Sequence, residues 1–245
     1  LFVFDFLTLH IHNPTAMNIG ILLSGCGVYD GAEIHEAVLS MLAISQHGWN
    51  LTCLGLDKEQ HHVINHLNGE EMPEKRNMLV EAARIARGTI TNVDQFDATK
   101  LDALVLPGGF GCAKNFTTWA FEGASCQIDP AILALIETMH RNKKPLVALC
   151  VSPVVIAKAL EKSEATPNLT VGHSQENSPY DQSWFSQELS KTGVVVEEKS
   201  HREISIDEKN RVICAPCYMM EASINEIYQN IQLAMSALKT LLDEN

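Results

Sequence analysis

One cysteine of this chain occupies a position suited to nucleophilic chemistry. The apolar run 146–149 leads directly into Cys150, and Ser152-Pro153 begins the next predicted helix. A thiol at such a strand-to-helix turn lies over the positive end of the helix, which stabilises thiolate over thiol. Most cysteines of globular proteins are merely small buried apolar residues, but the position of Cys150 predicts a nucleophile with a lowered pKa.

Two glycine-rich loops are expected beside this cysteine. Residues 25–31 follow the first predicted strand, and residues 107–111 follow the strand 101–106. The carboxyl ends of parallel strands meet at one edge of a sheet, where ligands bind near a switch in strand order. We therefore expect both loops and Cys150 on one rim.

Glu33 is the candidate proton-transfer group. It lies in the first turn of the helix that follows the first strand, where a carboxylate is electrostatically favoured. The simpler interpretation is a solvated charge at a helix start. However, a loop after the first strand can reach the centre of the sheet, where this carboxyl group could hydrogen-bond the sulfur and move protons.

Backbone N–H groups of Gly109 and Val151 are candidate oxyanion donors. Glycine lets the backbone approach a ligand closely, and Val151 directly follows the nucleophile. Gly108-Gly109 could instead make only a tight turn. The loop lacks the Gly-Lys-Ser/Thr ending of a phosphate-binding loop.

Histidine assistance and metal binding have weaker support. His173 follows a predicted strand and could approach the site, and His35 lies beside Glu33. A surface or capping role for His173 and a structural hydrogen bond for His35 are the simpler interpretations. Cys26 and Cys112 lie in the rim loops without a clear role. Cys214 and Cys217 lie close together, yet no second pair accompanies them, so we predict no metal site and no disulfide framework. Reduced thiols indicate a cytoplasmic protein.

Composition excludes several classes of function. The 245 residues carry a formal net charge of −12, and no run of Lys and Arg occurs, so nucleic-acid binding is not expected. The apolar stretch 1–9 is too short to span a membrane. Because Met17 immediately precedes the first predicted strand, residues 1–16 are interpreted as a non-native or disordered extension, a signal peptide being the alternative.

From Met17 onward, short apolar strands alternate with amphipathic helices. This alternation predicts an α/β fold with a mostly parallel sheet covered on both faces, in a single domain 17–245. In the helix 32–46, Ile34, Val38, Met41 and Leu42 have core spacing. Residues 174–183 are expected to form a loop, and strands near 203–206 and 212–214 to pair antiparallel. Further helices are predicted at 74–87, 129–141, 153–162 and 222–242.

Three motifs carry a family resemblance: residues 24–37, residues 106–111 with Lys114-Asn115, and Cys150 with Pro153. Together they resemble the ElbB-type isoprenoid-biosynthesis proteins of the PfpI and parkinsonism-associated deglycase superfamily, whose members have glyoxalase activity. The resemblance covers the chain from Met17 to the last helix. It implies a three-layer, flavodoxin-like fold of the class I glutamine amidotransferase type, and a homodimer.

The resemblance also implies a reaction. Cys150 falls on the superfamily's nucleophile, Glu33 on the glutamate that contacts it, and Gly109 on the loop whose amide faces the sulfur. A glutathione-independent glyoxalase would convert methylglyoxal or glyoxal to lactate or glycolate through a hemithioacetal, with no cofactor. Alternatives are a redox-sensing or stress-protective protein with an oxidisable cysteine, and a non-enzymatic partner in isoprenoid metabolism.

Two departures from relatives in the superfamily exclude other activities. Val151 stands where protease-like members have histidine. Residues 214–218 stand where glutamine amidotransferases carry a His-x-Glu pair. The sequence therefore supports neither a peptidase nor a glutaminase.

Overall fold

A seven-stranded sheet forms the centre of residues 16–244, the part of the chain that the computed structural model describes. The prediction that residues 1–16 form an extension concerns residues that, except for Ala16, lie outside the described part of the chain. The strand order is β3-β2-β1-β4-β5-β9-β8. The sheet strands are β1 (Asn18–Leu23), β2 (Asn50–Gly55), β3 (Thr91–Asn92), β4 (Ala103–Leu106), β5 (Leu146–Leu149), β8 (Ser205–Asp207) and β9 (Val212–Ala215).

The central strands are apolar throughout because helices cover both faces of the sheet. Every residue of β4, β5 and β9 is buried. All neighbouring strands run parallel except β8, which pairs antiparallel with β9. These pairings confirm the predicted α/β class, the mostly parallel sheet and the antiparallel pair near residue 210. A separate two-stranded sheet pairs β6 (Asn168–Leu169) with β7 (Val195–Val196).

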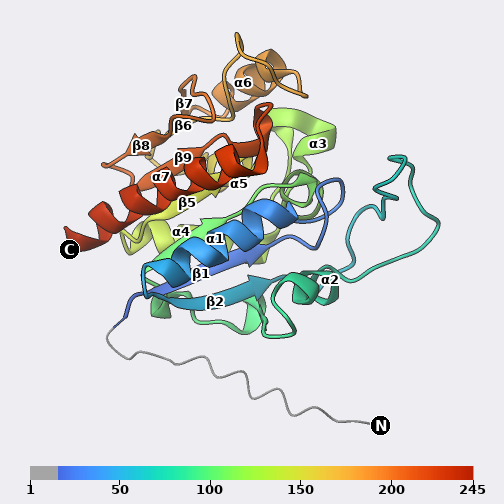
Figure 1. The fold of residues 1–245 in the computed structure, drawn as a ribbon, viewed down its shortest axis with the longest axis horizontal. Coiled ribbons are helices and arrows are strands. Elements are labelled where there is room, and N and C mark those ends of the chain that lie inside the picture. Colours follow the sequence, from blue (N-terminus) through green and yellow to red (C-terminus); the bar gives the residue numbers. More distant parts are fainter. Residues whose placement is uncertain (1–15, 245) are drawn as a thin grey trace.

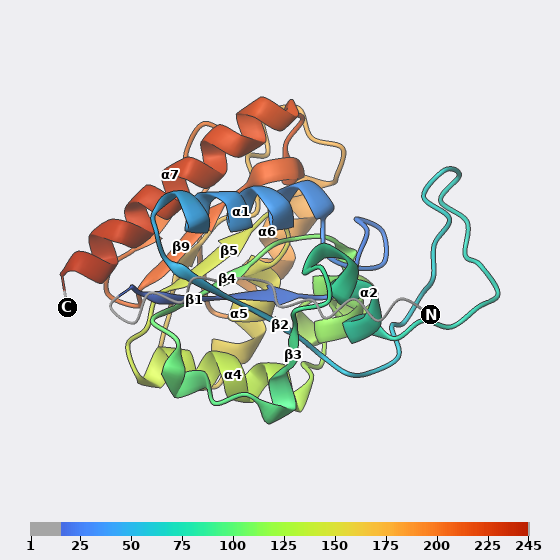
Figure 2. The same ribbon diagram turned by 60° about the horizontal axis from the view of Figure 1, so that its bottom comes forward.

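Helices form the two outer layers. Figures 1 and 2 show α1 and α7 side by side on one face of the sheet, and α4 and α5 on the other. Asp129 caps α4, whose first residue is Pro130, and Ser223 with Glu226 closes a capping box at the start of α7. The helices are α1 (Ile34–Gln46), α2 (Met78–Ile85), α3 (Trp119–Glu122), α4 (Pro130–Arg141), α5 (Pro153–Leu160), α6 (Gln182–Ser190) and α7 (Ile224–Asp243).

Helix α1 presents a different face to the sheet from the one predicted. The side chains of Ile34, Val38 and Leu42 are 42%, 47% and 44% exposed. The buried side chains are instead Glu36, Ala37, Ser40, Ala43 and Ile44. Four of these five are small or polar. Small side chains let α1 approach the sheet and α7 closely, and a buried carboxyl group is tolerated where it is hydrogen-bonded.

The region after β6 also differs from the prediction. Residues 174–181 form a loop, as expected, but α6 begins at Gln182 and was not predicted. Only Phe185 and Leu189 supply buried apolar side chains to this short helix, which leaves a weak periodic signal. Similarly, α2 begins at Met78, four residues later than predicted, because Asn77 caps it.

The topology fixes where a site can form. The chain proceeds outward from β1 through β2 to β3, then crosses back to β4 on the other side of β1. This reversal is the switch point at which open parallel sheets bind ligands. The loops after β1, β4 and β5 meet there. Within residues 16–244, no helix combines the length and apolar character needed to cross a membrane.

Candidate active site

Cys150 occupies a strained elbow between β5 and α5. Its φ of 58° lies in the left-handed region that non-glycine residues rarely adopt. The Ser152 hydroxyl stabilises the turn, because it accepts a hydrogen bond from Leu149 N (2.8 Å) and donates one to Leu106 O (2.7 Å). The elbow is thus tied to the end of β4, and the thiol is held in one place.

Backbone hydrogen bonds join the loops after β1 and β4. Phe110 N donates to Val28 O (2.7 Å), Gly111 N to Gly31 O (2.9 Å) and Glu33 N to Gly108 O (2.9 Å). Gly109 has a φ of 92°, and a Cβ at this residue would lie 2.3 Å from Gly31 O. Glycine is therefore required for the two loops to lie this close.

Glu36 is the carboxyl group that hydrogen-bonds the Cys150 thiol. Its side chain is fully buried. Oε2 accepts from Gly108 N (2.8 Å) and Oε1 from Tyr218 N (3.3 Å). Burial, followed by the nearby charge of Glu33, raises the pKa of Glu36 to about 8. A carboxyl group with that pKa can release and accept a proton near neutral pH.

Glu33, which we predicted to contact the thiol, has another position. It is the N-cap of α1, and its Oε2 accepts from Glu36 N at 2.6 Å. Its side chain is 8% exposed and lines a neighbouring pocket. Burial raises the pKa of Glu33, while hydrogen bonds from the helix N-terminus oppose that shift. The correction follows from helix phase, since Glu36 lies on the face of α1 toward Cys150.

The two predicted amide donors both point at the sulfur. The N–H groups of Gly109 and Val151 hydrogen-bond the Cys150 thiol. An oxyanion formed on a carbon attached to this sulfur would lie close to both donors, which is the arrangement that stabilises addition to a carbonyl group.

The Cys150 thiol is not acidic, contrary to the expectation from its place at a helix start. Its pKa lies well above the ordinary value, first because it is buried, and then because Glu36 and Cys217 are near. The amides of Gly109 and Val151 lower the pKa but do not outweigh burial. With a side chain 4% exposed, the thiol carries its proton at rest and needs a base to remove it.

A pocket of about 490 Å³ opens beside this cluster. Two of its lining residues relate it to the thiol, which does not itself line the pocket. Tyr218 N–H donates to Glu36, and the Tyr180 hydroxyl lies within electrostatic range of Cys150. The walls are largely aromatic and apolar, with carboxyl groups at Glu33 and Glu221. The lining residues are Val28, Tyr29, Glu33, His35, Pro179, Tyr180, Tyr218, Met220, Glu221 and Ala222.

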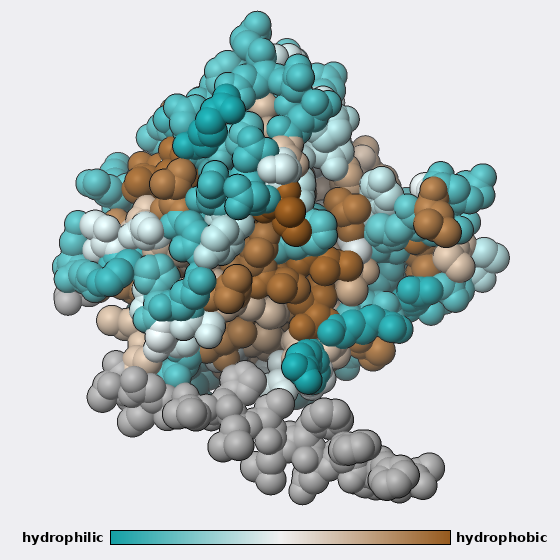
Figure 3. Space-filling model, viewed as in Figure 1, coloured by the Kyte–Doolittle hydropathy of each residue, from teal (hydrophilic) through white to brown (hydrophobic). Residues whose placement is uncertain are grey.

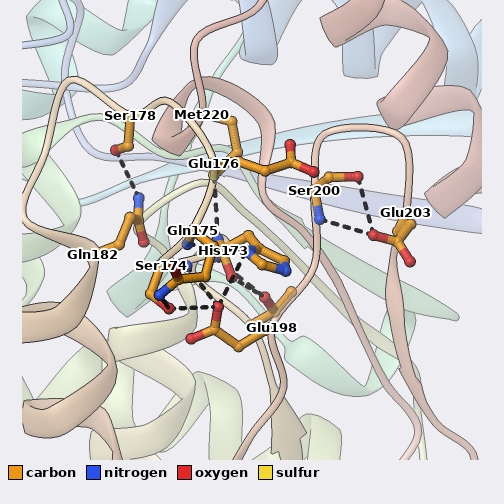
Figure 4. A network of polar contacts seen from close by, with 12 residues as sticks. His173, Ser174, Gln175, Glu176, Ser178, Gln182, Glu198, Ser200, Glu203 and Met220 are labelled. Atoms are coloured by element: carbon orange, nitrogen blue, oxygen red, sulfur yellow. Dashed lines mark hydrogen bonds and ion pairs between the residues drawn. The ribbon is translucent and has the colours of Figure 1, made fainter.

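The two candidate histidines have separate surroundings. His35 is exposed at the pocket, where its Nδ1 lies 2.9 Å from the Tyr218 hydroxyl. Figure 4 shows His173 in the polar loop beyond β6, beside Glu198. Its Nδ1 lies 3.4 Å from Glu198 Oε2 and accepts from Gln175 N (3.1 Å). These contacts place His173 in a structural network of polar side chains.

No metal centre is formed by the described part of the chain. Within it, no group of three or more His, Cys, Asp or Glu side chains could hold a metal ion. All seven cysteines are free thiols, and Cys112 is a buried thiol that donates to Pro107 O (3.3 Å). Cys26 is partly exposed in the rim loop.

Sequence patterns did not predict roles in the site for Glu36, Cys217 or the tyrosines of the pocket. Glu36 could have been considered beside Glu33, because these two are the only Asp, Glu, Lys or Arg residues of the predicted helix 32–46. Tyr180 and Tyr218 follow no local pattern, since tertiary packing brings them to the pocket from distant loops.

No family model matches the chain. Individual proteins, however, are similar to it over most of its length. A rat protein named ES1 protein homolog, mitochondrial, is 39% identical over 217 residues, which is 87% of this chain and 79% of the relative. A human protein named glutamine amidotransferase-like class 1 domain-containing protein 3, mitochondrial, is 37% identical over 228 residues, or 91% and 83% of the two chains. These names give no support to the cytoplasmic expectation.

Solved structures agree with the fold. The isoprenoid biosynthesis protein with an amidotransferase-like domain from Ehrlichia chaffeensis has a TM-score of 0.82 and 34% identity, covering 91% of this chain and 99% of that one. Drosophila melanogaster DJ-1beta (TM-score 0.53, 15% identity, 94% and 95% coverage) shares the fold alone. With relatives this similar over most of its length, the chain belongs to the ES1 family of class I glutamine amidotransferase-like proteins.

Proposed function

We propose that this chain is an enzyme, a cofactor-independent glyoxalase that converts small 2-oxoaldehydes to 2-hydroxy acids without glutathione. The observation that carries the proposal is the cluster at the elbow. A thiol is hydrogen-bonded to a carboxyl group with a pKa of about 8, two N–H groups point at its sulfur, and a pocket adjoins it. A glyoxalase III from Candida albicans has the same fold at 11% identity, which supports the fold but not the reaction.

The first step is addition of the thiol to the aldehyde. Glu36 takes the thiol proton as the sulfur attacks the aldehyde carbon, and the new oxyanion is stabilised by the N–H groups of Gly109 and Val151. Protonation of that oxygen by Glu36 gives a neutral hemithioacetal. The thiolate therefore forms only during attack, which suits a buried thiol with a raised pKa.

The second step moves a proton between adjacent carbons. Glu36 removes the proton from the carbon attached to sulfur, which gives an enediolate. The hydroxyl proton of the enediolate passes to the neighbouring oxygen, and Glu36 returns the first proton to the neighbouring carbon. The product is a thioester of the hydroxy acid. Water hydrolyses it and restores the Cys150 thiol, so methylglyoxal plus water gives lactate with no net change in oxidation state.

The pocket is larger than methylglyoxal requires. Its volume of about 490 Å³ lies in the range of ordinary ligand sites, and Tyr29, Tyr180 and Tyr218 line it. A 2-oxoaldehyde with an apolar substituent would bury that group against aromatic walls. Phenylglyoxal is therefore expected to give a kcat/KM roughly tenfold above methylglyoxal, corresponding to about 1.4 kcal/mol of added burial.

Purified protein incubated with methylglyoxal, without glutathione, tests the proposal by the appearance of lactate. Cys150→Ala should abolish turnover, and Glu36→Gln should lower kcat by about 10²–10⁴ because proton transfer is lost. Cys112→Ala is the matched control, a buried cysteine in the adjoining loop whose loss should leave turnover largely intact. Lactate formation by a folded Cys150→Ala variant would overturn the mechanism, and an inert wild type would overturn the function.

A further inference from the structure

A second buried thiol lies beside Cys150 and has no part in the reaction above. Cys217 begins a helical turn just after β9, the strand next to β5. Leu149 and Ala215 are register partners, and Cys150 N donates to Ala215 O at 2.9 Å. The same Cys150 N–H also hydrogen-bonds the Cys217 sulfur. The two cysteines thus follow registered ends of adjacent strands, which lie about 4.8 Å apart.

The backbone at Cys217 is held in an unusual conformation. Its φ is 45°, so both cysteines are left-handed non-glycine residues. Asn230, fully buried in α7, accepts from Cys217 N (3.0 Å) and donates to Glu203 O (2.8 Å). Left-handed non-glycine residues are strained, and they concentrate at functional sites. A buried amide therefore fixes Cys217 in its strained position.

Cys150 is a better placed partner for Cys217 than Cys214 is, although only two residues separate Cys214 from Cys217. The Cys214 thiol is hydrogen-bonded by the backbone of Thr170 and lies within electrostatic range of Glu197 and Asp207. The Cys217 thiol lies within range of Glu36 and Glu33 instead. The two thiols thus have different surroundings, and Cys217 shares those of Cys150.

We propose that Cys150 and Cys217 form a disulfide when a hydroperoxide reaches the pocket, with Cys217 as the resolving thiol. The Cys150 sulfur attacks the peroxide, so that an S–O bond forms and the O–O bond breaks. The leaving oxygen takes up a proton and departs as water or an alcohol. The Cys217 sulfur then attacks the sulfenic acid, the S–S bond forms, and water leaves with the Cys217 proton.

The two electrons that reduce the peroxide come from the two thiols, so atoms and electrons balance without a cofactor. The disulfide would protect Cys150 from irreversible oxidation to sulfinic acid. A dithiol in the surroundings would reverse it by exchange. This inference does not depend on the glyoxalase reaction, because its product is read by mass.

Intact mass and peptide mapping of the full chain after treatment with stoichiometric hydrogen peroxide test the proposal. Wild type should lose the mass of two hydrogens and yield a peptide linking residues 150 and 217, and dithiothreitol should reverse both changes. Cys217→Ser should instead gain one oxygen at Cys150 and, when a second equivalent of peroxide is added, two. The matched control Cys214→Ala should still form the 150–217 link.

Three outcomes would overturn the proposal. The first is sulfinic acid at Cys150 of wild type while Cys217 stays reduced, and the second is a link from Cys150 to Cys26. The third is a link between Cys214 and Cys217. If Cys217→Ser fails to fold, Cys217→Ala provides the second variant. The peptide map of wild type tests the 150–217 link without any variant.

Discussion

Glu36 connects three parts of the site at the scale of a single residue. Its two oxygens accept from the loop after β4 and the loop after β9, and it hydrogen-bonds the thiol from the elbow after β5. Because the Cys150 pKa is raised, the thiol relies on this carboxyl group as its base. The protonation state of Glu36 should therefore control the rate.

The pH dependence of kcat/KM follows from this role. Glu36 must be ionised to accept the thiol proton, and its pKa is about 8, so activity should rise as pH increases from 6 to 9, with a midpoint near 8. Steady-state rates with methylglyoxal across that range would measure the rising limb.

Glu33→Gln is the matched variant for the same experiment. The Glu33 charge is one cause of the raised Glu36 pKa, and glutamine retains an oxygen that can cap α1. The rising limb should shift to lower pH in this variant. A limb that stays in place would show that a group other than Glu36 is being titrated.

At the scale of elements, the loop after β4 depends on Gly109. An alanine there would place a Cβ 2.3 Å from Gly31 O and 2.4 Å from Glu33 N, in addition to left-handed strain at a φ of 92°. Gly109→Ala should therefore separate the loops, displace an N–H group from the sulfur, and lower kcat about 10²-fold or more.

Gly193→Ala is the matched control, because it introduces left-handed backbone strain without the steric clash expected for Gly109→Ala. Gly193 has a φ of 86°, but a Cβ there would meet nothing within 4 Å. Its substitution should lower the free energy of unfolding by roughly 1 kcal/mol and leave kcat unchanged. Thermal unfolding and kcat measured on both variants would check the pair, and similar kcat values for the two would contradict the role given to Gly109.

The same elements show how far sequence can predict this structure. The strands around β1, β4, β5 and β9 were predictable because each is a short apolar run, and the elbow followed from β5 and Pro153. The face of α1 was not predictable from hydrophobic spacing, since Ile34, Val38 and Leu42 imitate a core stripe. The expectation for Glu33 rested on its place at the helix start and on the family resemblance, whereas the structure hydrogen-bonds Glu36 to the thiol. The Tyr218 contact and the Cys217 position needed the register of distant strands.

At the scale of the whole molecule, α1 leaves an apolar stripe unpaired in the described chain. Figure 3 shows apolar surface gathered over this helix, where Ile34, Val38 and Leu42 are 42%, 47% and 44% exposed. Glu36 is its only Asp, Glu, Lys or Arg and is buried. With a net charge of −12, copies of this chain repel each other except where the surface is uncharged. We therefore propose that two copies of this chain pair through α1.

Sedimentation velocity tests that expectation. Wild type should have the mass of a dimer, and the double variant Val38→Lys with Leu42→Lys should be a monomer, since it places four buried ammonium groups in the interface. Val80→Lys on α2 is the control, because Val80 is 60% exposed on another helix. A monomeric wild type, or a dimeric double variant, would contradict the pairing.

Because the pKa of Glu36 is raised, the folded chain should be less stable under alkaline conditions. Its pKa is about 8 in the folded chain and ordinarily 4.5, so folding favours the protonated form. Its contribution to stability is complete below pH 4.5, declines by up to roughly 1.4 kcal/mol per pH unit, and is lost above pH 8. Urea unfolding at pH 6 and pH 9 should show a larger loss for wild type than for Glu36→Gln, and equal losses would contradict this linkage. In the proposed reaction, ionisation of one carboxyl group thus activates the site and destabilises the fold, so that the most active form of the protein is also its least stable.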